Sequence, residues 1–150
     1  MTNTNFRVLL LAAGLGKRLK PLTDNIPKCL IAIDKKPLLH LWLDKLEKLQ
    51  IESVLINTHY LPIKVHQSIQ RWNNQSLKIY TSYEKQLLGT AGTLLNNLDF
   101  FRGSKGLIIH ADNATKDDLR EFLKAHKSRP KEALISMLTF DTDNPEQCGV

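Results

Sequence analysis

A glycine-broken basic segment carries the clearest chemistry in this 150-residue sequence. The apolar run Val8–Ala13 leads into Gly14 and Gly16, and the cations Lys17 and Arg18 follow directly. A strand that ends in such a loop exposes backbone N–H groups at its carboxyl end, where open α/β sheets bind ligands. Glycines let the backbone approach a ligand and adopt unusual dihedral angles. Successive N–H groups form an anion-binding nest, and arginine presents a fork of donors that matches phosphate oxygens. The segment therefore predicts a polyphosphate-binding loop.

Other phosphate-binding motifs fit this segment less well. A Walker loop needs a hydroxyl residue directly after its lysine, where Arg18 stands, and the glycine spacing also differs. A dinucleotide fingerprint needs a third glycine in place of Leu19 and an uninterrupted helix, which Pro21 and Pro27 oppose. A plain glycine turn with solvated cations would explain Gly14-x-Gly16 alone. It would not explain why further prolines and Lys28 follow in one rigid basic segment.

The residues from Leu11 to Leu30 resemble the long signature of the sugar-1-phosphate nucleotidyltransferases. The likeness continues through Ile56–Tyr60, Leu88–Leu94 and Ala111–Asn113, and reaches Cys148–Val150, where the sequence stops. It therefore covers the whole chain but only the N-terminal part of the family's domain. The resemblance implies that the nucleotide contacts Leu11, Ala13, Gly14, Gly16, Lys17 and Arg18.

The same resemblance assigns the reacting end of the site. It implies that Lys28 neutralises charge near the α-phosphate and that Arg18 holds the outer phosphates. Asp112 directly follows the apolar run 107–111, and the resemblance to a Gly-Asp-Asn motif implies that it binds catalytic Mg²⁺. Ala111 replaces the usual glycine, so slight crowding of the ligand is expected. Strand alternation predicts that His110 points elsewhere, as a core histidine.

A second loop, Glu84–Gly92, resembles the nucleobase loop of the family. The resemblance implies a backbone contact from Gly89, and Thr90 is expected to cap the following helix. Glu84 has two open interpretations: a carboxylate that accepts hydrogen bonds from a guanine edge, or a solvated loop residue. Gly149 resembles the glycine that contacts the sugar, although Cys148 stands where an aromatic residue is usual.

Apolar periodicity predicts alternating strands and helices. Strands are expected at 7–13, 53–58, 77–81, 106–111 and 133–140. Helices are expected after Pro37, over 61–72, over 91–98 and from about Lys116. The inward residues of the first are expected to be Leu38, Leu39, Trp42, Leu46 and Leu49. Those of the helix over 91–98 are expected to be Ala91, Leu94, Leu95 and Leu98. Such alternation favours a parallel sheet with right-handed crossovers. The prediction is one doubly wound, Rossmann-like α/β domain over residues 1–150.

Composition limits the partners. The net charge of +6 suits anionic substrates. Basic runs of at most two residues and sparse aromatics argue against nucleic acid. Cys29 and Cys148 show neither zinc spacing nor a disulfide framework, so both are expected to be buried thiols. No signal peptide or bilayer-spanning apolar run is evident, so a reduced, cytoplasmic protein with no membrane partner is expected.

The expected activity is nucleotidyl transfer from a nucleoside triphosphate to a sugar 1-phosphate, with Mg²⁺ as cofactor and guanylyl transfer slightly favoured. The alternative is a catalytically incomplete nucleotide-binding or regulatory module. Family enzymes are longer, and their second magnesium aspartate and most sugar contacts would lie beyond Val150. Slow turnover by this chain and self-association, including a homo-oligomer, are therefore expected.

Overall fold

The computed structural model describes residues 6–73 and 76–144. The chain divides into two compact units, one ending at Thr115 and the other beginning at Lys116, and each is considered by itself. The expectation of a single domain stays a prediction. Within the described residues, no helix has both the length and the apolar character needed to cross a bilayer.

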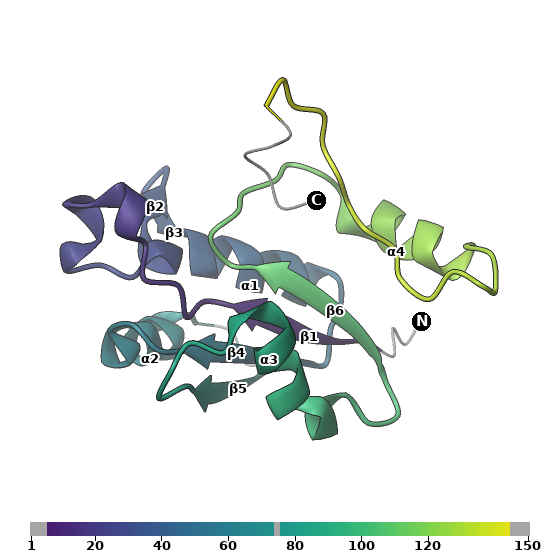
Figure 1. The fold of residues 1–150 in the computed structure, drawn as a ribbon, viewed down its shortest axis with the longest axis horizontal. Coiled ribbons are helices and arrows are strands. Elements are labelled where there is room, and N and C mark those ends of the chain that lie inside the picture. The colour runs from purple at the N-terminus through teal and green to yellow at the C-terminus, as the bar shows by residue number, and fades with distance from the viewer. Residues whose placement is uncertain (1–5, 74–75, 145–150) are drawn as a thin grey trace. The chain divides into compact units, whose positions relative to one another are not determined.

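The first unit is built on a four-stranded parallel sheet (Figure 1). Its strands are β1 (Phe6–Leu11), β4 (Ser53–Thr58), β5 (Lys78–Tyr83) and β6 (Lys105–His110), in the spatial order β5-β4-β1-β6. The chain places β4 and then β5 on one side of β1, and returns to place β6 on the other side. The carboxyl ends of β1 and β6 therefore flank a topological switch point, where sheets of this kind bind ligands.

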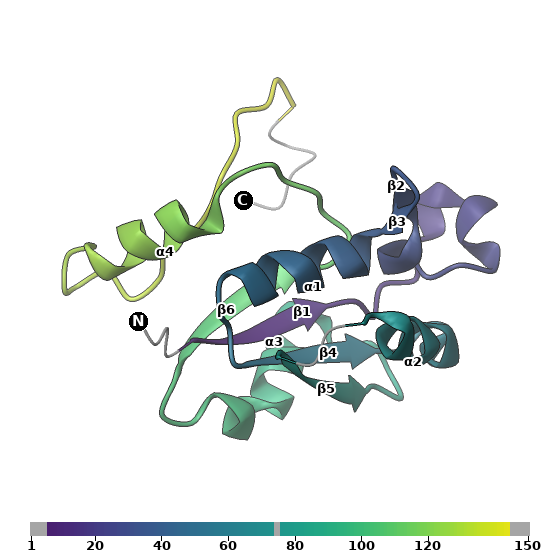
Figure 2. The ribbon, with the colours of Figure 1, turned by 180° about the vertical axis from the view of Figure 1, so that it is seen from behind.

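Helices cover both faces of this sheet, which confirms the doubly wound α/β prediction. Helix α1 (Leu38–Lys48) lies on one face and α3 (Gly89–Asn96) on the other, and α2 (Pro62–Arg71) connects β4 to β5 (Figures 1 and 2). The predicted apolar stripe of α1 is confirmed by the burial of Leu38, Leu39, Trp42 and Leu46. Both β1 and β4 are buried almost throughout, as expected for central strands of a parallel sheet.

Helix α3 departs from its predicted inward face. Leu95 and Leu98 are 66% and 52% exposed, whereas Thr93 is 1% exposed. The hydroxyl of Thr93 makes hydrogen bonds inside the protein. A polar residue therefore takes the inward position on α3 that the apolar periodicity predicted for leucines. Thr90 does not cap the helix, because Leu88 is the N-cap residue and no side chain caps that end.

Between β1 and α1 the chain forms short elements rather than a helix. Three 3₁₀ turns, η1 (Lys17–Leu19), η2 (Leu22–Asp24) and η3 (Lys28–Leu30), are followed by a small antiparallel pair, β2 (Ala32–Ile33) and β3 (Lys36–Pro37). A fourth turn, η4 (Leu98–Phe101), precedes β6. Strand β6 is buried on one face only, because Leu107 and Ile109 are inward whereas Ile108 is 40% exposed.

The second unit contains helix α4 (Leu119–Lys127), which the sequence predicted. Asp118 caps it by accepting a hydrogen bond from the backbone N–H of Arg120, and Leu119 and Leu123 are buried. The strand predicted over 133–140 does not form. Leu134 and Ile135 are 82% and 78% exposed. An apolar extended segment becomes a strand only when another strand pairs with it, and no described strand does so here.

Candidate functional site

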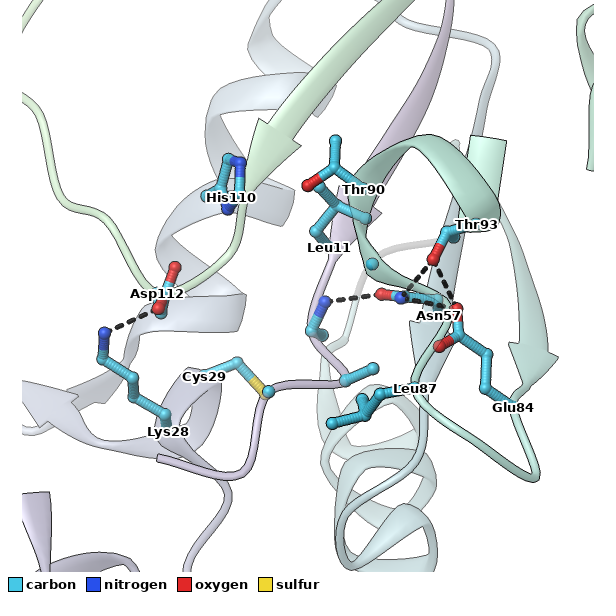
Figure 3. Close-up of a pocket in the computed structure, with 14 residues that line it drawn as sticks. Leu11, Lys28, Cys29, Asn57, Glu84, Leu87, Thr90, Thr93, His110 and Asp112 are labelled. Carbon is cyan, nitrogen blue, oxygen red and sulfur yellow. Dashed lines mark hydrogen bonds and ion pairs between the residues drawn. The ribbon is translucent and has the colours of Figure 1, made fainter. Parts of the chain in front are cut away.

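A cavity of about 220 Å³ opens at the carboxyl edge of the sheet (Figure 3). It lies where β1, β4 and β6 end and where α3 begins. Its walls are Leu11, Ala12, Ala13, Gly14, Lys28, Cys29, Asn57, Glu84, Leu87, Gly89, Thr90, Thr93, His110 and Asp112. A second, more polar hollow of about 470 Å³ is lined by Gly14, Gly16, Lys17, Arg18, Leu19, Lys28 and Asp112.

The two hollows share Gly14, Lys28 and Asp112. The structure thus brings together the expected site residues from three distant parts of the sequence. Gly149 lies outside the described residues. In the second hollow, the side chains of Lys17 and Arg18 are exposed and form no ion pair with any described residue. Two cations therefore remain available to an anionic ligand.

The two loop glycines have different roles. Gly16 has φ +64°, in the left-handed region that favours glycine, and a Cβ there would lie 2.9 Å from Cγ2 of Thr23. Gly14 has no heavy atom within 4 Å of such a Cβ, so open space adjoins it at the junction of the hollows. Of the two glycines, Gly16 has the left-handed backbone and Gly14 does not.

Two residues outside the predicted set hold the basic loop in place. The Thr23 hydroxyl, on a side chain that is 1% exposed, donates to the carbonyl of Gly16 at 2.8 Å. The Tyr60 hydroxyl lies 2.9 Å from the carbonyl oxygen of Thr23 and 2.8 Å from that of Asp24. In the described part of the chain, the backbone N–H groups of residues 13–16 donate to no other residue. The loop is thus held by hydrogen bonds, while its amides meet no competing acceptor among the described residues.

Lys28 and Asp112 form an ion pair where the hollows meet. Nζ of Lys28 lies 2.6 Å from Oδ2 of Asp112, and the two side chains are 26% and 33% exposed (Figure 3). Helix α1 steadies this corner, because the indole N–H of Trp42 donates to the carbonyl of Asn113 at 2.8 Å.

At the other end of the first cavity, Glu84 is buried rather than solvated. Its side chain is 3% exposed, and its Oε1 accepts hydrogen bonds from Nδ2 of Asn57 at 2.9 Å and from the hydroxyl of Thr93 at 2.6 Å. Its Oε2 accepts from the backbone N–H of Leu88 at 3.2 Å. The alternative of a solvated loop carboxylate is therefore wrong. Asn57 and Thr93 were missed because a lone Asn or Thr gives no sequence signal for a buried partner.

Residues around Asp112 correct two further expectations and confirm a third. His110 is an exposed residue that lines the cavity, not a core histidine, because β6 is buried only at alternate positions. Ala111 is fully buried and does not line the cavity, so its methyl group does not crowd a ligand there. Cys29 is 2% exposed, which confirms the predicted buried thiol, and this burial raises the pKa of the thiol to about 12.

Comparison with known proteins identifies the family. The model of the nucleotidyl transferase family matches residues 7–150, nearly the whole chain. The chain belongs to this family. It is 30% identical over 148 residues to mannose-1-phosphate guanylyltransferase 1 of Arabidopsis thaliana, covering 96% of this chain and 40% of the relative. It is 31% identical over 142 residues to the bifunctional protein GlmU of Methanocaldococcus jannaschii, covering 95% and 31%.

Solved structures agree with this assignment. The crystal structure of HddC from Yersinia pseudotuberculosis complexed with GMP-PN has a TM-score of 0.71 and 28% identity, over 81% of this chain and 54% of that one. The chain therefore spans about two fifths of the first relative's length and about half of this structure.

One residue of this site offers a ligand of the kind that Mg²⁺ takes. Mg²⁺ is usually bound by one or two carboxylates together with substrate phosphates and water. Asp112 offers such a carboxylate beside the cationic hollow. Among the described residues, no three carboxylate, histidine or cysteine side chains gather into a metal site. A divalent cation here would thus depend on phosphate oxygens for its remaining ligands.

Proposed function

We propose that this nucleotidyl transferase binds a nucleoside triphosphate and transfers its nucleotidyl group to a sugar 1-phosphate. The observation that supports the proposal is the pair of hollows joined at Lys28 and Asp112. The first is smaller, and apolar groups and the buried carboxylate of Glu84 line part of it, which suits a base. The other is cationic, which suits phosphates. The shared corner lies between them, where an α-phosphate would lie.

In the proposed reaction, an oxygen of the sugar 1-phosphate attacks the α-phosphorus and forms a new P–O bond. The bond between the α-phosphorus and its bridging oxygen breaks, and pyrophosphate leaves with the electron pair. No general base is needed, because a phosphate monoester, with a second pKa of about 6, is already mostly dianionic at pH 7. Catalysis then rests on positioning and on neutralisation of charge.

Each cationic residue has a defined part in this proposal. The loop amides and Arg18 hold the outer phosphates, and Lys17 adds positive charge beside them. Lys28 leaves Asp112 to neutralise charge at the α-phosphate and the incoming sugar phosphate. Asp112 would hold Mg²⁺, which supplies charge neutralisation on the phosphate oxygens when bound. Gly89 and Thr90 border the base, and Gly149 is proposed to contact the sugar.

Guanylyl transfer is the proposed base preference. A carboxylate only accepts hydrogen bonds, and guanine offers N–H donors at N1 and N2. Oε1 of Glu84 already accepts two internal hydrogen bonds, whereas Oε2 accepts one. Each carboxylate oxygen has about two acceptor sites, so Oε1 is fully used and Oε2 has one site left. We therefore expect one guanine N–H to bind at Oε2 and none at Oε1. The guanylyltransferase relatives support the same preference.

The test is a screen of the four ribonucleoside triphosphates and thymidine triphosphate against several sugar 1-phosphates, with pyrophosphate release as the readout. Arg18→Ala should weaken triphosphate binding by about 1.5–3 kcal/mol, the value of a hydrogen bond to a charged group. Arg71→Ala, at the exposed end of α2, is the matched control. Equal triphosphate affinity in both variants would refute the assignment of Arg18.

The alternative is a nucleotide-binding module without turnover, and it is favoured because Asp112 is the only carboxylate among the described residues that line the cationic hollow. Nucleotide binding with no sugar-dependent pyrophosphate release would select this alternative. The expected cytoplasmic location and homo-oligomer stay predictions.

A further inference from the structure

We propose that Asn57 is a positioning residue that sets base selectivity and joins the base end of the pocket to the start of the phosphate loop. The inference rests on the proposed function, because it assigns a role within the nucleotide pocket. Asn57 stands near the end of β4, opposite Leu11 of β1, and its side chain is 3% exposed. It lies at the centre of the hydrogen-bond network drawn in Figure 3.

Both ends of the Asn57 amide are engaged. Its Oδ1 accepts the backbone N–H of Ala12 at 2.7 Å, and its Nδ2 donates to Oε1 of Glu84 at 2.9 Å and to the Thr93 hydroxyl at 3.3 Å. The Thr93 hydroxyl in turn donates to the same Oε1 at 2.6 Å. One side chain therefore links Ala12, which directly follows β1, and Glu84, which directly follows β5, to Thr93 of α3.

The chemistry of these partners allows only one orientation of the amide. A backbone N–H can only donate, so the oxygen of Asn57 must face Ala12. With the oxygen at Ala12, the nitrogen faces Glu84 and donates to its Oε1. An aspartate would keep the first contact but lose the second. A leucine would leave the N–H of Ala12 and one side of a buried carboxylate without their partner, which is costly in a low-dielectric interior.

This network fixes the carboxylate rather than merely burying it. The backbone of Glu84 is also held, because its N–H donates to the carbonyl of Thr58 at 2.8 Å and its carbonyl oxygen lies 2.8 Å from Nδ1 of His59. No lysine or arginine of the described residues pairs with it. Two donors at Oε1 set the rotation of the carboxylate, so Oε2 is presented beside Leu88 at the base loop. Ala12 directly precedes the loop that carries Gly14, so the same amide fixes the entry to the phosphate end.

The chain offers a closely matched pair of variants. Thr93→Val removes the hydroxyl that donates to Oε1 but leaves Asn57 and its bond to Ala12 in place, and Thr93→Ser restores the donor. Thr58→Val makes the same change next to Asn57, at a side chain that is 0% exposed and whose hydroxyl has no partner among the described residues. Asn57→Asp breaks the link to Glu84, and Asn57→Leu breaks both links.

The measurements are calorimetric affinities of the full chain for the four ribonucleoside triphosphates and for inorganic tripolyphosphate, with thermal melts as a check on folding. We expect Thr93→Val to lower the ratio of affinities between the best and worst bases about three- to tenfold, the effect of one hydrogen bond. Its tripolyphosphate affinity should be unchanged, and Thr93→Ser and Thr58→Val should match the parent. Asn57→Leu should lower both the base ratio and the tripolyphosphate affinity.

A folded Thr93→Val variant with a lower melting temperature but the parent's base ratio would overturn the proposal, because the network would then be only structural. This holds even if the Asn57 variants fail to fold. A parent chain that binds no triphosphate would overturn the proposed function together with this inference. A parent that binds all bases equally would overturn the selectivity role alone.

Discussion

Replacing Gly16 with alanine tests the geometry of the basic loop directly. The left-handed backbone at φ +64° costs an alanine about 1–2 kcal/mol. The new Cβ would also lie 2.9 Å from Cγ2 and 3.1 Å from Cβ of Thr23, whose side chain is 1% exposed. Moving Thr23 would weaken its hydrogen bond to the Gly16 carbonyl, worth about 0.5–1.5 kcal/mol. Gly16→Ala should therefore destabilise the first unit by roughly 1.5–3.5 kcal/mol.

Gly103→Ala provides the matched control. Gly103 has a similar φ of +73°, but no heavy atom lies within 4 Å of the position of its Cβ. It should show only the backbone cost of about 1–2 kcal/mol. Urea unfolding followed by the fluorescence of Trp42 and Trp72, both buried in the first unit, measures each variant.

A Thr23→Ser background separates the two parts of the cost. This change removes the nearest atom, Cγ2, and keeps the hydroxyl, so the extra cost of Gly16→Ala over Gly103→Ala should shrink. If Gly16→Ala costs no more than Gly103→Ala in the parent background, the steric argument is wrong. If neither substitution destabilises the protein, the left-handed backbone conformation assigned to Gly16 and Gly103 is wrong as well.

Three further predictions follow from the same geometry. Gly14→Ala should leave stability unchanged but lower triphosphate affinity, since its Cβ meets only open space beside both hollows; calorimetry showing the parent's affinity would contradict this. Lys28→Met should raise the affinity for Mn²⁺ in the absence of nucleotide, measured by electron paramagnetic resonance, because the metal ion no longer has to displace the Lys28 ammonium from Asp112. An unchanged affinity would show that the ion pair does not compete with the metal. Burial opposes ionisation of Asp44, but hydrogen bonds from Lys36 and Trp72 outweigh it and hold the pKa of that carboxyl below its ordinary value of 3.8. Its contribution to stability is thus present above that value and lost as the pH falls below it, so Asp44→Asn should flatten the acid limb of a pH–stability profile, and an unaltered limb would refute this.

The sheet and most helices could be predicted because their apolar residues repeat with a clear period. The stripe of α1 and the buried strands β1 and β4 follow from local sequence alone. The segment 133–140 has the same apolar character but is not a strand. Strand formation depends on a neighbour's edge, which local sequence does not encode.

The site divides in the same way. Gly16, Arg18, Lys28 and Asp112 were predicted because a long motif carries them, and the structure places them together. The burial of the Glu84 carboxylate and its hydrogen bonds were not predicted. Asn57 is 27 positions from Glu84 and 36 positions from Thr93 in the sequence, and hydrogen bonds over such separations leave no periodic signal. The prediction for α3 was wrong for the same reason: its one buried residue, Thr93, is held there by a polar contact.

Mapping triphosphate binding onto the backbone by NMR tests the central claim most directly. Guanosine triphosphate with Mg²⁺, titrated into ¹⁵N-labelled chain, should shift the amides of residues 12–18, 28, 88–90 and 112 most strongly. The same titration of the Asp112→Asn variant should show weaker binding at the same residues. Shifts concentrated away from the carboxyl edge of β1 and β6, or the same affinity with and without the Asp112 carboxylate, would contradict the account.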